Sequence, residues 1–203
     1  MKLYSLKGAP NPRRVRIFLA EKRVSLPVEE FDLEKGLHRQ PDFLKRNPLG
    51  LLPVLELDDG RTICESVAIC RHFDEMIPEP PLFGRSSRER VDVEMWSRHM
   101  EHELLVPMID VFVHTHPLWA GKRTQIPAYG ELRHGQMMER LRWIDEMLKD
   151  REFIAGDRYT IADITAQVAV LTGRAVARLA IPDDHTNLTR WWKAVSTRPT
   201  ARA

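Results

Sequence analysis

Residues Asn47–Leu57 read NPLGLLPVLEL, and the pair Glu65-Ser66 follows shortly after them. The first four residues of this stretch predict a turn, and Val54–Leu57 predicts a strand. Because proline has no N–H to donate to a strand ladder, Pro53 must begin the strand or lie at a bend. The stretch therefore predicts a turn that leads directly into the first residue of a strand.

A hairpin and a helix continue from this strand. The turn signal Asp58-Asp59-Gly60 separates the strand from a second candidate strand, Arg61–Cys64, and strands joined by so tight a turn run antiparallel. Glu65-Ser66 then opens a helix. The chain thus presents a backbone edge at Leu52 close in sequence to an acid and a hydroxyl at a helix start. This arrangement suits a small peptide-like ligand that carries a carboxylate and an ammonium group.

The residues before this stretch complete a small α/β domain. Strands are predicted over Lys2–Ser5 and Val28–Leu33, and Asn11 is predicted to cap the helix between them, with Pro12 as its first residue. A helix that joins two strands implies a right-handed crossover and a parallel pair. Residues 36–47 are helix-prone but interrupted by a proline. Together with the antiparallel hairpin, these elements predict a mixed four-stranded sheet.

A proline-rich segment, Pro78–Pro81, follows the helix that starts at Glu65-Ser66. It predicts a stiff, extended linker. Beyond it, apolar residues recur with a period of 3.6 for the rest of the chain, which predicts helices alone. The expected domains are residues 1–77, a linker over residues 78–86, and an all-α domain over residues 87–203.

The composition is that of an ordinary globular protein. Of the 203 residues, 43% are hydrophobic and 30% charged, and the net charge of +2 is too balanced to indicate nucleic-acid binding. No N-terminal signal peptide and no apolar run of membrane-spanning length are visible. Cys64 and Cys70 lack the spacing of a disulfide framework or zinc site. We expect a cytoplasmic protein with no nucleic-acid and no membrane partner.

Three motifs, in this order, resemble the soluble glutathione transferases over nearly the whole chain. They are the stretch Asn47–Leu55, the pair Glu65-Ser66, and the block Phe153–Asp163, in which Thr160 and Asp163 predict a helix capping box. The N-terminal opening Ala9–Val15 is most similar to bacterial members near the Nu class. The resemblance implies a thioredoxin-like N-terminal domain, which contains the mixed sheet and a cis-proline, and an all-helical C-terminal domain.

The resemblance also implies a glutathione site. It implies that Pro53 is cis and that the backbone of Leu52 pairs with the cysteinyl part of glutathione like an added strand. It places the γ-glutamyl carboxylate at Ser66, where a helix start attracts anions, and the ligand's ammonium group at Glu65. It places the glycyl carboxylate near His38. Alternatives remain for each: a trans proline on an edge strand, an N-cap serine, a surface acid and a surface histidine.

The sequence gives a less direct indication of the group that stabilises the thiolate. A free thiol has a pKa near 8.5, so an enzyme gains by lowering it with hydrogen-bond donors or positive charge. Ala9 stands where family members often have serine or threonine, and it has no hydroxyl. The next candidate is Asn11, which matches an asparagine of Nu-like members and is the expected catalytic residue, although capping its helix would also explain it. Ser5 offers a hydroxyl but lies too early in the motif.

Histidines of the second domain raise the alternative of a metal site. His99 and His102 are one turn apart, and His114 and His116 form a second close pair. No HExxH motif or cysteine set accompanies them. We therefore expect no metal, with glutathione as co-substrate and no further cofactor.

The leading interpretation is a homodimeric glutathione transferase. Its bound thiolate would conjugate or reduce a small electrophile. The alternatives are a glutathione-dependent disulfide reductase or peroxidase, and a glutathione-binding interaction module with little catalysis, which Ala9 keeps open. The Ser-Ser-Cys opening of zeta-type isomerases is absent.

Overall fold

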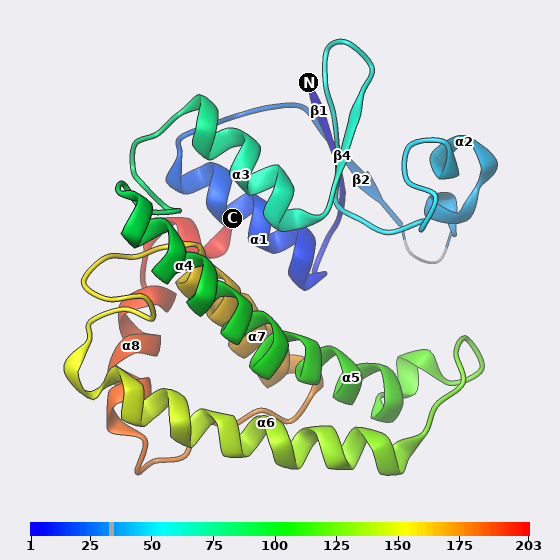
Figure 1. Ribbon diagram of the computed structural model, residues 1–203. Helices are drawn as coiled ribbons and strands as arrows, with labels where there is room; N and C mark the ends of the chain where they lie inside the picture. The colour runs from blue at the N-terminus through cyan, green and yellow to red at the C-terminus, as the bar shows by residue number, and fades with distance from the viewer. Residues whose placement is uncertain (33–34) are drawn as a thin grey trace. The chain divides into compact units, whose positions relative to one another are not determined.

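The computed structural model describes residues 1–32 and 35–203 (Figure 1). The first part of the chain forms β1 (Lys2–Leu6), α1 (Pro10–Glu21), β2 (Val28–Phe31), η1 (Leu37–Arg39), α2 (Pro41–Leu44), β3 (Val54–Glu56), β4 (Thr62–Cys64) and α3 (Ser66–Met76). The rest forms α4 (Ser87–Met100), η2 (Glu101–Leu105), α5 (Val106–Thr115), η3 (Pro117–Trp119), α6 (Pro127–Met147), η4 (Leu148–Asp150), α7 (Ile161–Val176), α8 (Thr186–Ser196) and η5 (Pro199–Arg202).

The chain forms two compact units. Residues 1–82, together with residues 202 and 203, make the first unit, and residues 83–201 make the second. Over the ranges 1–32 and 35–203, no helix combines the length and the apolar character needed to cross a bilayer. The α/β organisation of the first unit and the helical organisation of the second agree with the sequence analysis.

The sheet of the first unit is mixed, with strand order β2-β1-β3-β4. β1 pairs in parallel with β2 and antiparallel with β3, and β3 pairs antiparallel with β4. The strand expected over residues 28–33 is observed as Val28–Phe31, and position 33 lies outside the described residues. The parallel pair and the hairpin are thus confirmed.

Two buried layers flank this sheet, because alternate residues of a strand face opposite sides. Leu3 and Leu55 are partners across β1 and β3 and are fully buried. Tyr4, the next residue of β1, belongs to a separate buried cluster with Phe31 of β2 and Phe43 of α2. Helices α1 and α3 pack against each other, and Figure 1 shows them side by side.

A buried lysine anchors the segment that follows α3. The side chain of Lys22, at the end of α1, is fully buried and forms an ion pair with Asp74 of α3 at 2.6 Å. Its Nζ also donates to the carbonyl oxygens of Ile77 and Pro80, each at 2.6 Å. The start of the proline-rich segment is therefore held against α1 by hydrogen bonds.

In the second unit, α4, η2 and α5 follow one another as one long helical run (Figure 1). The middle piece, η2, is a π-helix in which the Val106 N–H donates to the carbonyl of Glu101, five residues back. Pro107 follows immediately. In a regular α-helix its ring would clash with the carbonyl of Glu103, and it has no N–H to donate there. The wider turn before Pro107 has this physical cause.

Helix α7 is the most buried element of the second unit, since every residue from Ile161 to Val170 is buried. Its start has the capping box predicted from the sequence. The Asp163 carboxylate accepts from the Thr160 N–H at 2.9 Å, and the Thr160 hydroxyl accepts from the Ala162 N–H at 3.3 Å. Asp163 also accepts the indole N–H of Trp191 on α8 at 2.9 Å. One buried carboxylate thus joins the start of α7 to α8.

Candidate glutathione site

The strand register brings the predicted site residues of the first unit to one end of the sheet. Val54, the first residue of β3, pairs with Cys64, the last residue of β4. Continued outward by two residues, this antiparallel register brings Leu52-Pro53 beside Glu65-Ser66. Val54 also pairs with Tyr4, so the end of β1, which leads to the start of α1, lies at the same end. Two helix starts and one strand start therefore meet there.

The peptide bond between Leu52 and Pro53 is cis, as the resemblance implied. Leu52 is half-buried and precedes the ladder of β3. Within residues 1–32 and 35–203, its backbone N–H and C=O make no backbone hydrogen bond. These two groups are therefore available to an extended ligand.

A buried asparagine builds the turn that leads to Leu52. The side chain of Asn47 donates to the Leu51 carbonyl at 2.9 Å and accepts from the Leu49 N–H at 3.1 Å. The Gly50 N–H donates to the Asn47 carbonyl at 2.8 Å, and Gly50 has a left-handed φ of 60°. These contacts fix the course of the chain into the strand. Asn47 belongs to the sequence motif, but the motif alone does not reveal that its side chain builds this turn.

His38 lies beside this turn. It is half-buried in η1, and a Cβ atom added to Gly50 would stand only 2.8 Å from its carbonyl oxygen. A side chain at Gly50 would therefore push η1 away from the turn, in addition to the strain of a left-handed φ. This close approach of the two backbones brings η1 near the chain just before Leu52.

The start of α3 differs from the N-cap role considered for Ser66. Glu65 occupies the N-cap position with a φ of 74°, and Ser66 is the first helical residue. No side chain caps this helix start, and the first intrahelical bond runs from the Ile69 N–H to the Glu65 carbonyl. The Glu65 carboxylate is exposed and has no hydrogen-bond or ion-pair partner in the described part of the chain. The left-handed backbone at Glu65 moves the cap one residue earlier than the sequence suggested.

The sequence analysis missed the partner of Ser66. Arg14 of α1 is 1% exposed, and its Nη1 donates to the Ser66 hydroxyl oxygen at 3.0 Å. A buried arginine on the face of α1 that packs on α3 has no distinctive spacing, because the other arginines of this helix look the same in sequence. Only the packing of the two helices identifies it.

The start of α1 also corrects a prediction. Ala9, not Asn11, is the N-cap, and Pro10 is the first helical residue. Proline at the first helical position is pre-organised for the helix, so Pro10 displaces the cap that was expected at Asn11. Asn11 lies instead inside the first turn. Its side-chain oxygen is buried and has no partner among residues 1–32 and 35–203. Because Pro10 and Pro12 have no N–H, Asn11 also has the only backbone donor of these three residues.

The electrostatics at this end of the sheet reflect burial. Burial lowers the pKa of Arg13, and the charge of Arg16 lowers it further. Burial raises the pKa of the Cys64 thiol, as does the negative charge of Glu65. Ser5, the weaker candidate for thiolate stabilisation, is fully buried in β1 and accepts from Arg16 Nη1 at 3.4 Å.

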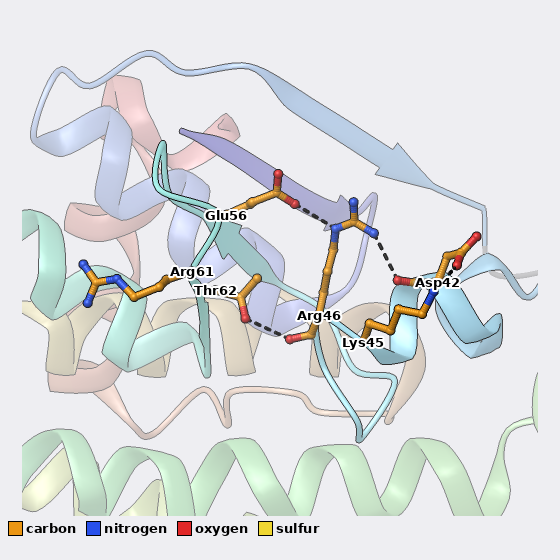
Figure 2. A pocket seen from close by; sticks show the side chains of 7 residues that line it. Asp42, Lys45, Arg46, Glu56, Arg61 and Thr62 are labelled. Carbon is orange, nitrogen blue, oxygen red and sulfur yellow. Dashed lines mark hydrogen bonds and ion pairs between the residues drawn. The ribbon is translucent and has the colours of Figure 1, made fainter.

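A different hollow, of about 750 Å³, lies toward the other end of β3 (Figure 2). Its lining comes from α2 and its C-terminal end and from the β3–β4 hairpin: Asp42, Lys45, Arg46, Glu56, Gly60, Arg61 and Thr62. Figure 2 shows two ion pairs among its charged groups, Arg46 with Glu56 and Lys45 with Asp42. Arg46 Nε lies 2.7 Å from Glu56, and Lys45 lies 2.8 Å from Asp42. None of the six predicted site residues lines this hollow.

Three of the four histidines considered for a metal site have partners that fit a structural role, and the fourth, His102, is exposed. His99 packs edge-on against Trp96 and Trp143. His114 accepts the Ile126 N–H at 3.0 Å, and His116 accepts the Leu118 N–H at 3.2 Å. Nowhere in the described ranges do three histidine, cysteine or acidic side chains gather as a metal site would require.

Comparison with known proteins identifies the two units. Residues 9–76 match the family model of the glutathione S-transferase N-terminal domain, and residues 112–199 match that of the C-terminal domain. Glutathione S-transferase 2 of Saccharomyces cerevisiae is 34% identical, over 100% of this chain and 88% of its own length. The similarity to this relative therefore extends over both units.

Solved structures agree. The crystal structure of Gtt2 from Saccharomyces cerevisiae superimposes with a TM-score of 0.93 at 32% identity, covering 100% of this chain and 99% of that one. A glutathione S-transferase domain-containing protein from Marinobacter aquaeolei gives 0.92 at 35% identity, covering 99% and 100%. Full-length sequence similarity, both domain models and the shared fold lead to one conclusion: the chain belongs to the glutathione S-transferase family.

Proposed function

We propose that this chain binds glutathione at the shared end of β3 and α3 and uses the bound thiolate to attack small electrophiles, as in detoxification. The observation that carries the proposal is the uncapped start of α3 beside the unpaired backbone of Leu52. Free first-turn amides and a partial positive charge favour a carboxylate, and an open backbone edge favours a peptide. Glutathione offers both groups.

Each predicted residue then has a role in this proposal. The backbone of Leu52, next to Pro53, pairs with the cysteinyl part of the ligand. Ser66 and the α3 amides hold the γ-glutamyl carboxylate, and Glu65 holds the ammonium group. His38, on the other side of the turn at Gly50, donates one hydrogen bond to the glycyl carboxylate.

Asn11 is the proposed thiolate donor. It lies in the first turn of α1, where two prolines leave it as the residue with an N–H, and its buried amide has an unused oxygen in the described structure. Side-chain oxygen and nitrogen positions of an amide exchange by a simple flip, so the buried position can equally present the NH₂ group to sulfur. Each unit by which the thiol pKa falls corresponds to about 1.4 kcal/mol of thiolate stabilisation.

One observation favours a second candidate, a glutathione-binding module with little catalysis. The N-cap of α1 is Ala9, which provides no side-chain hydrogen bond. A site that binds glutathione through α3 but does not lower the pKa of its thiol would act as such a binding module. The two functions differ in one measurable quantity, the pKa of the bound thiol.

The test is a pH titration of thiolate absorbance with glutathione bound. We expect a thiol pKa clearly below the usual value of about 8.5 in the wild type and a return toward that value in Asn11→Ala. Asn187→Ala, on α8, is the matched control and should leave the pKa unchanged. An unshifted wild-type pKa would favour the module, and absence of glutathione binding would refute the proposal as a whole.

The same variants separate conjugation from reduction. Nu-like members, which the Ala9–Val15 opening resembles, lean toward glutathione-dependent disulfide reduction, and this is the finer assignment within the proposal. Turnover of an aryl halide and of a small disulfide should both fall in Asn11→Ala. A fall in only one of them identifies the reaction that depends on this donor.

A homodimer is part of the proposal. Val91 and Met95, four residues apart on one face of α4, are 65% and 44% exposed, and apolar side chains at this spacing suit a partner surface. Light scattering should give twice the 23.6 kDa of one chain. The double substitution of both residues by aspartate should yield monomers, whereas a monomeric wild type would refute the dimer.

We also place the protein in the cytoplasm. Cys64 and Cys70 are both free thiols, as is usual in a reducing compartment. Cell fractionation should recover the protein with the cytosolic fraction, and recovery elsewhere would contradict this part of the proposal.

A further inference from the structure

A buried hydrogen bond joins the two helices whose starts form the proposed site. Arg14 on α1 and Ser66 on α3 are 1% and 5% exposed, and the bond between Arg14 Nη1 and Ser66 Oγ is 3.0 Å long. The bond spans helices that are distant in sequence but packed together. Ser66 is therefore held from the side of α1 by a group that is always positively charged.

The direction of the serine proton follows from the donors and acceptors. A hydroxyl has one proton to donate and two lone pairs, while a guanidinium has only donors. Since Arg14 donates to the Ser66 oxygen, the hydroxyl proton cannot point back at Arg14. Within the two described ranges, the hydroxyl of Ser66 donates to no protein acceptor. Its proton is therefore left available to a group outside the protein.

The charge of Arg14 also acts on the start of α3. It partly offsets the rise that burial causes in the pKa of Cys70, which lies one turn beyond Ser66. A buried positive charge behind the uncapped amides of this helix adds to the partial positive charge of the helix start. Both make the position more favourable for an anion.

We propose that Arg14 is a positioning residue, which turns the proton of the Ser66 hydroxyl toward the carboxylate of the γ-glutamyl group. This inference rests on the proposed function, because it assumes that glutathione binds at α3. Arg14 does not touch the ligand in this role. It fixes the hydroxyl so that the incoming carboxylate meets a hydrogen bond already in place.

The test compares two ligands that differ in this one carboxylate. They are glutathione and γ-aminobutyryl-cysteinyl-glycine, which lacks the α-carboxylate of the glutamyl residue. Calorimetry gives their dissociation constants for the wild type, Arg14→Met, Arg14→Lys, Ser66→Ala and the double variant Arg14→Met/Ser66→Ala. Hydrogen bonds to charged groups have energies that correspond to an affinity change of roughly tenfold or more.

We expect Arg14→Met to weaken glutathione binding roughly tenfold and to leave binding of the analogue unchanged. Arg14→Lys, which keeps a charge and donors, should recover part of the loss. The double variant should bind glutathione no more weakly than Ser66→Ala alone, because both changes remove one coupled contact. Should Arg14→Met not fold, the lysine variant and Ser66→Ala supply the same comparison between ligands.

Equal losses for the two ligands would overturn the inference, because a purely structural role of Arg14 would produce them. Independent, additive losses in the double variant would overturn it as well. Either result leaves the proposed function intact, since the wild type still binds glutathione. A wild type that binds neither ligand refutes the proposed function itself.

Discussion

Helices α3 and α7 begin in opposite ways. At α7, the side chains of Thr160 and Asp163 accept from N–H groups at the helix start, and the same carboxylate accepts from the Ile154 N–H at 2.9 Å. At α3, the residue in the N-cap position is the exposed Glu65, which caps nothing. Both starts contain an acid and a hydroxyl residue. Of the two, the α3 start leaves its amides available.

The difference separates a structural helix start from a binding one. First-turn amides must find an acceptor, either within the protein or outside it. In α7 the acceptors are buried side chains, and the gain is stability of the fold. In α3 the acceptor is left to solvent or to a ligand, so the same backbone groups can serve recognition. The identity of the N-cap residue and its backbone conformation decide whether a helix start is structural or serves binding.

Removing Asp163, the acid at the capped start of α7, should have the largest effect on stability. Asp163→Ala leaves the N–H groups of Ile154, Thr160 and Trp191 without their acceptor, and each buried unpaired donor costs about 1–3 kcal/mol. We expect the free energy of unfolding to fall by about 3 kcal/mol or more, measured by urea denaturation at neutral pH. The exposed Asp157→Ala is the control and should change it by less than about 0.5 kcal/mol. A similarly small loss in Asp163→Ala would remove the stability side of the comparison.

The stability that the capped start of α7 contributes should also depend on pH. Burial raises the pKa of Asp163 from 3.8 to about 6. The folded state holds this proton more tightly than the unfolded chain does. The protonated Asp163 carboxyl therefore contributes its full stabilisation of the fold below about pH 4, and this contribution is lost as pH rises through about 6. The unfolding free energy of the wild type relative to Asp163→Asn should therefore decrease by up to about 3 kcal/mol between about pH 4 and pH 7. Urea titrations at each pH measure it, and a difference that grows with pH would show that the hydrogen bonds keep the carboxylate ionised.

Neutralising Glu65, the acid at the uncapped start of α3, should affect glutathione binding and not stability. In Glu65→Gln, the dissociation constant for glutathione should rise about tenfold, because charge-assisted hydrogen bonds are about twice as strong as neutral ones. The free energy of unfolding should stay within about 0.5 kcal/mol, since Glu65 is exposed. Calorimetry and urea denaturation of one preparation give both values. Lost stability with unchanged affinity would reverse the roles assigned to the two starts.

The start of α4 is a third case, and there we expect the smallest effect. Ser86 is a true N-cap of α4, and its hydroxyl accepts from the Glu89 N–H at 3.2 Å. Ser86→Ala should lower the free energy of unfolding by about 1 kcal/mol without changing glutathione affinity. Together with Glu65→Gln it forms a pair in which each variant changes only one property. An affinity change in Ser86→Ala would mean that the two properties are not separable in this chain.

The sequence predicted the fold well where local signals and burial agree. The tight turn at Asp58–Gly60 and the helix between the first two strands were sufficient for a mixed sheet, and both features are present. The capping box of α7 was visible because its two residues are three apart. Such features depend on near neighbours, which a sequence displays directly.

The site was harder to predict because it depends on backbone conformation and on distant packing. Glu65 adopts a left-handed φ that its residue type does not announce, so the cap falls one residue before Ser66. Pro10 moves the start of α1 ahead of Asn11. The bond between Arg14 and Ser66 joins residues 52 positions apart, and no spacing rule links them.

The π-helix between α4 and α5 has a consequence for everything that follows it. A turn closed by a bond to the fifth residue back holds more residues than an α-turn, so the side chains of α5 are rotated about the axis relative to an uninterrupted continuation of α4. This phase shift decides that Met108 and Val111 are buried. Shortening the chain by one residue within Glu101–Leu105 would return the run to α-helical phase and turn a different set of α5 side chains inward.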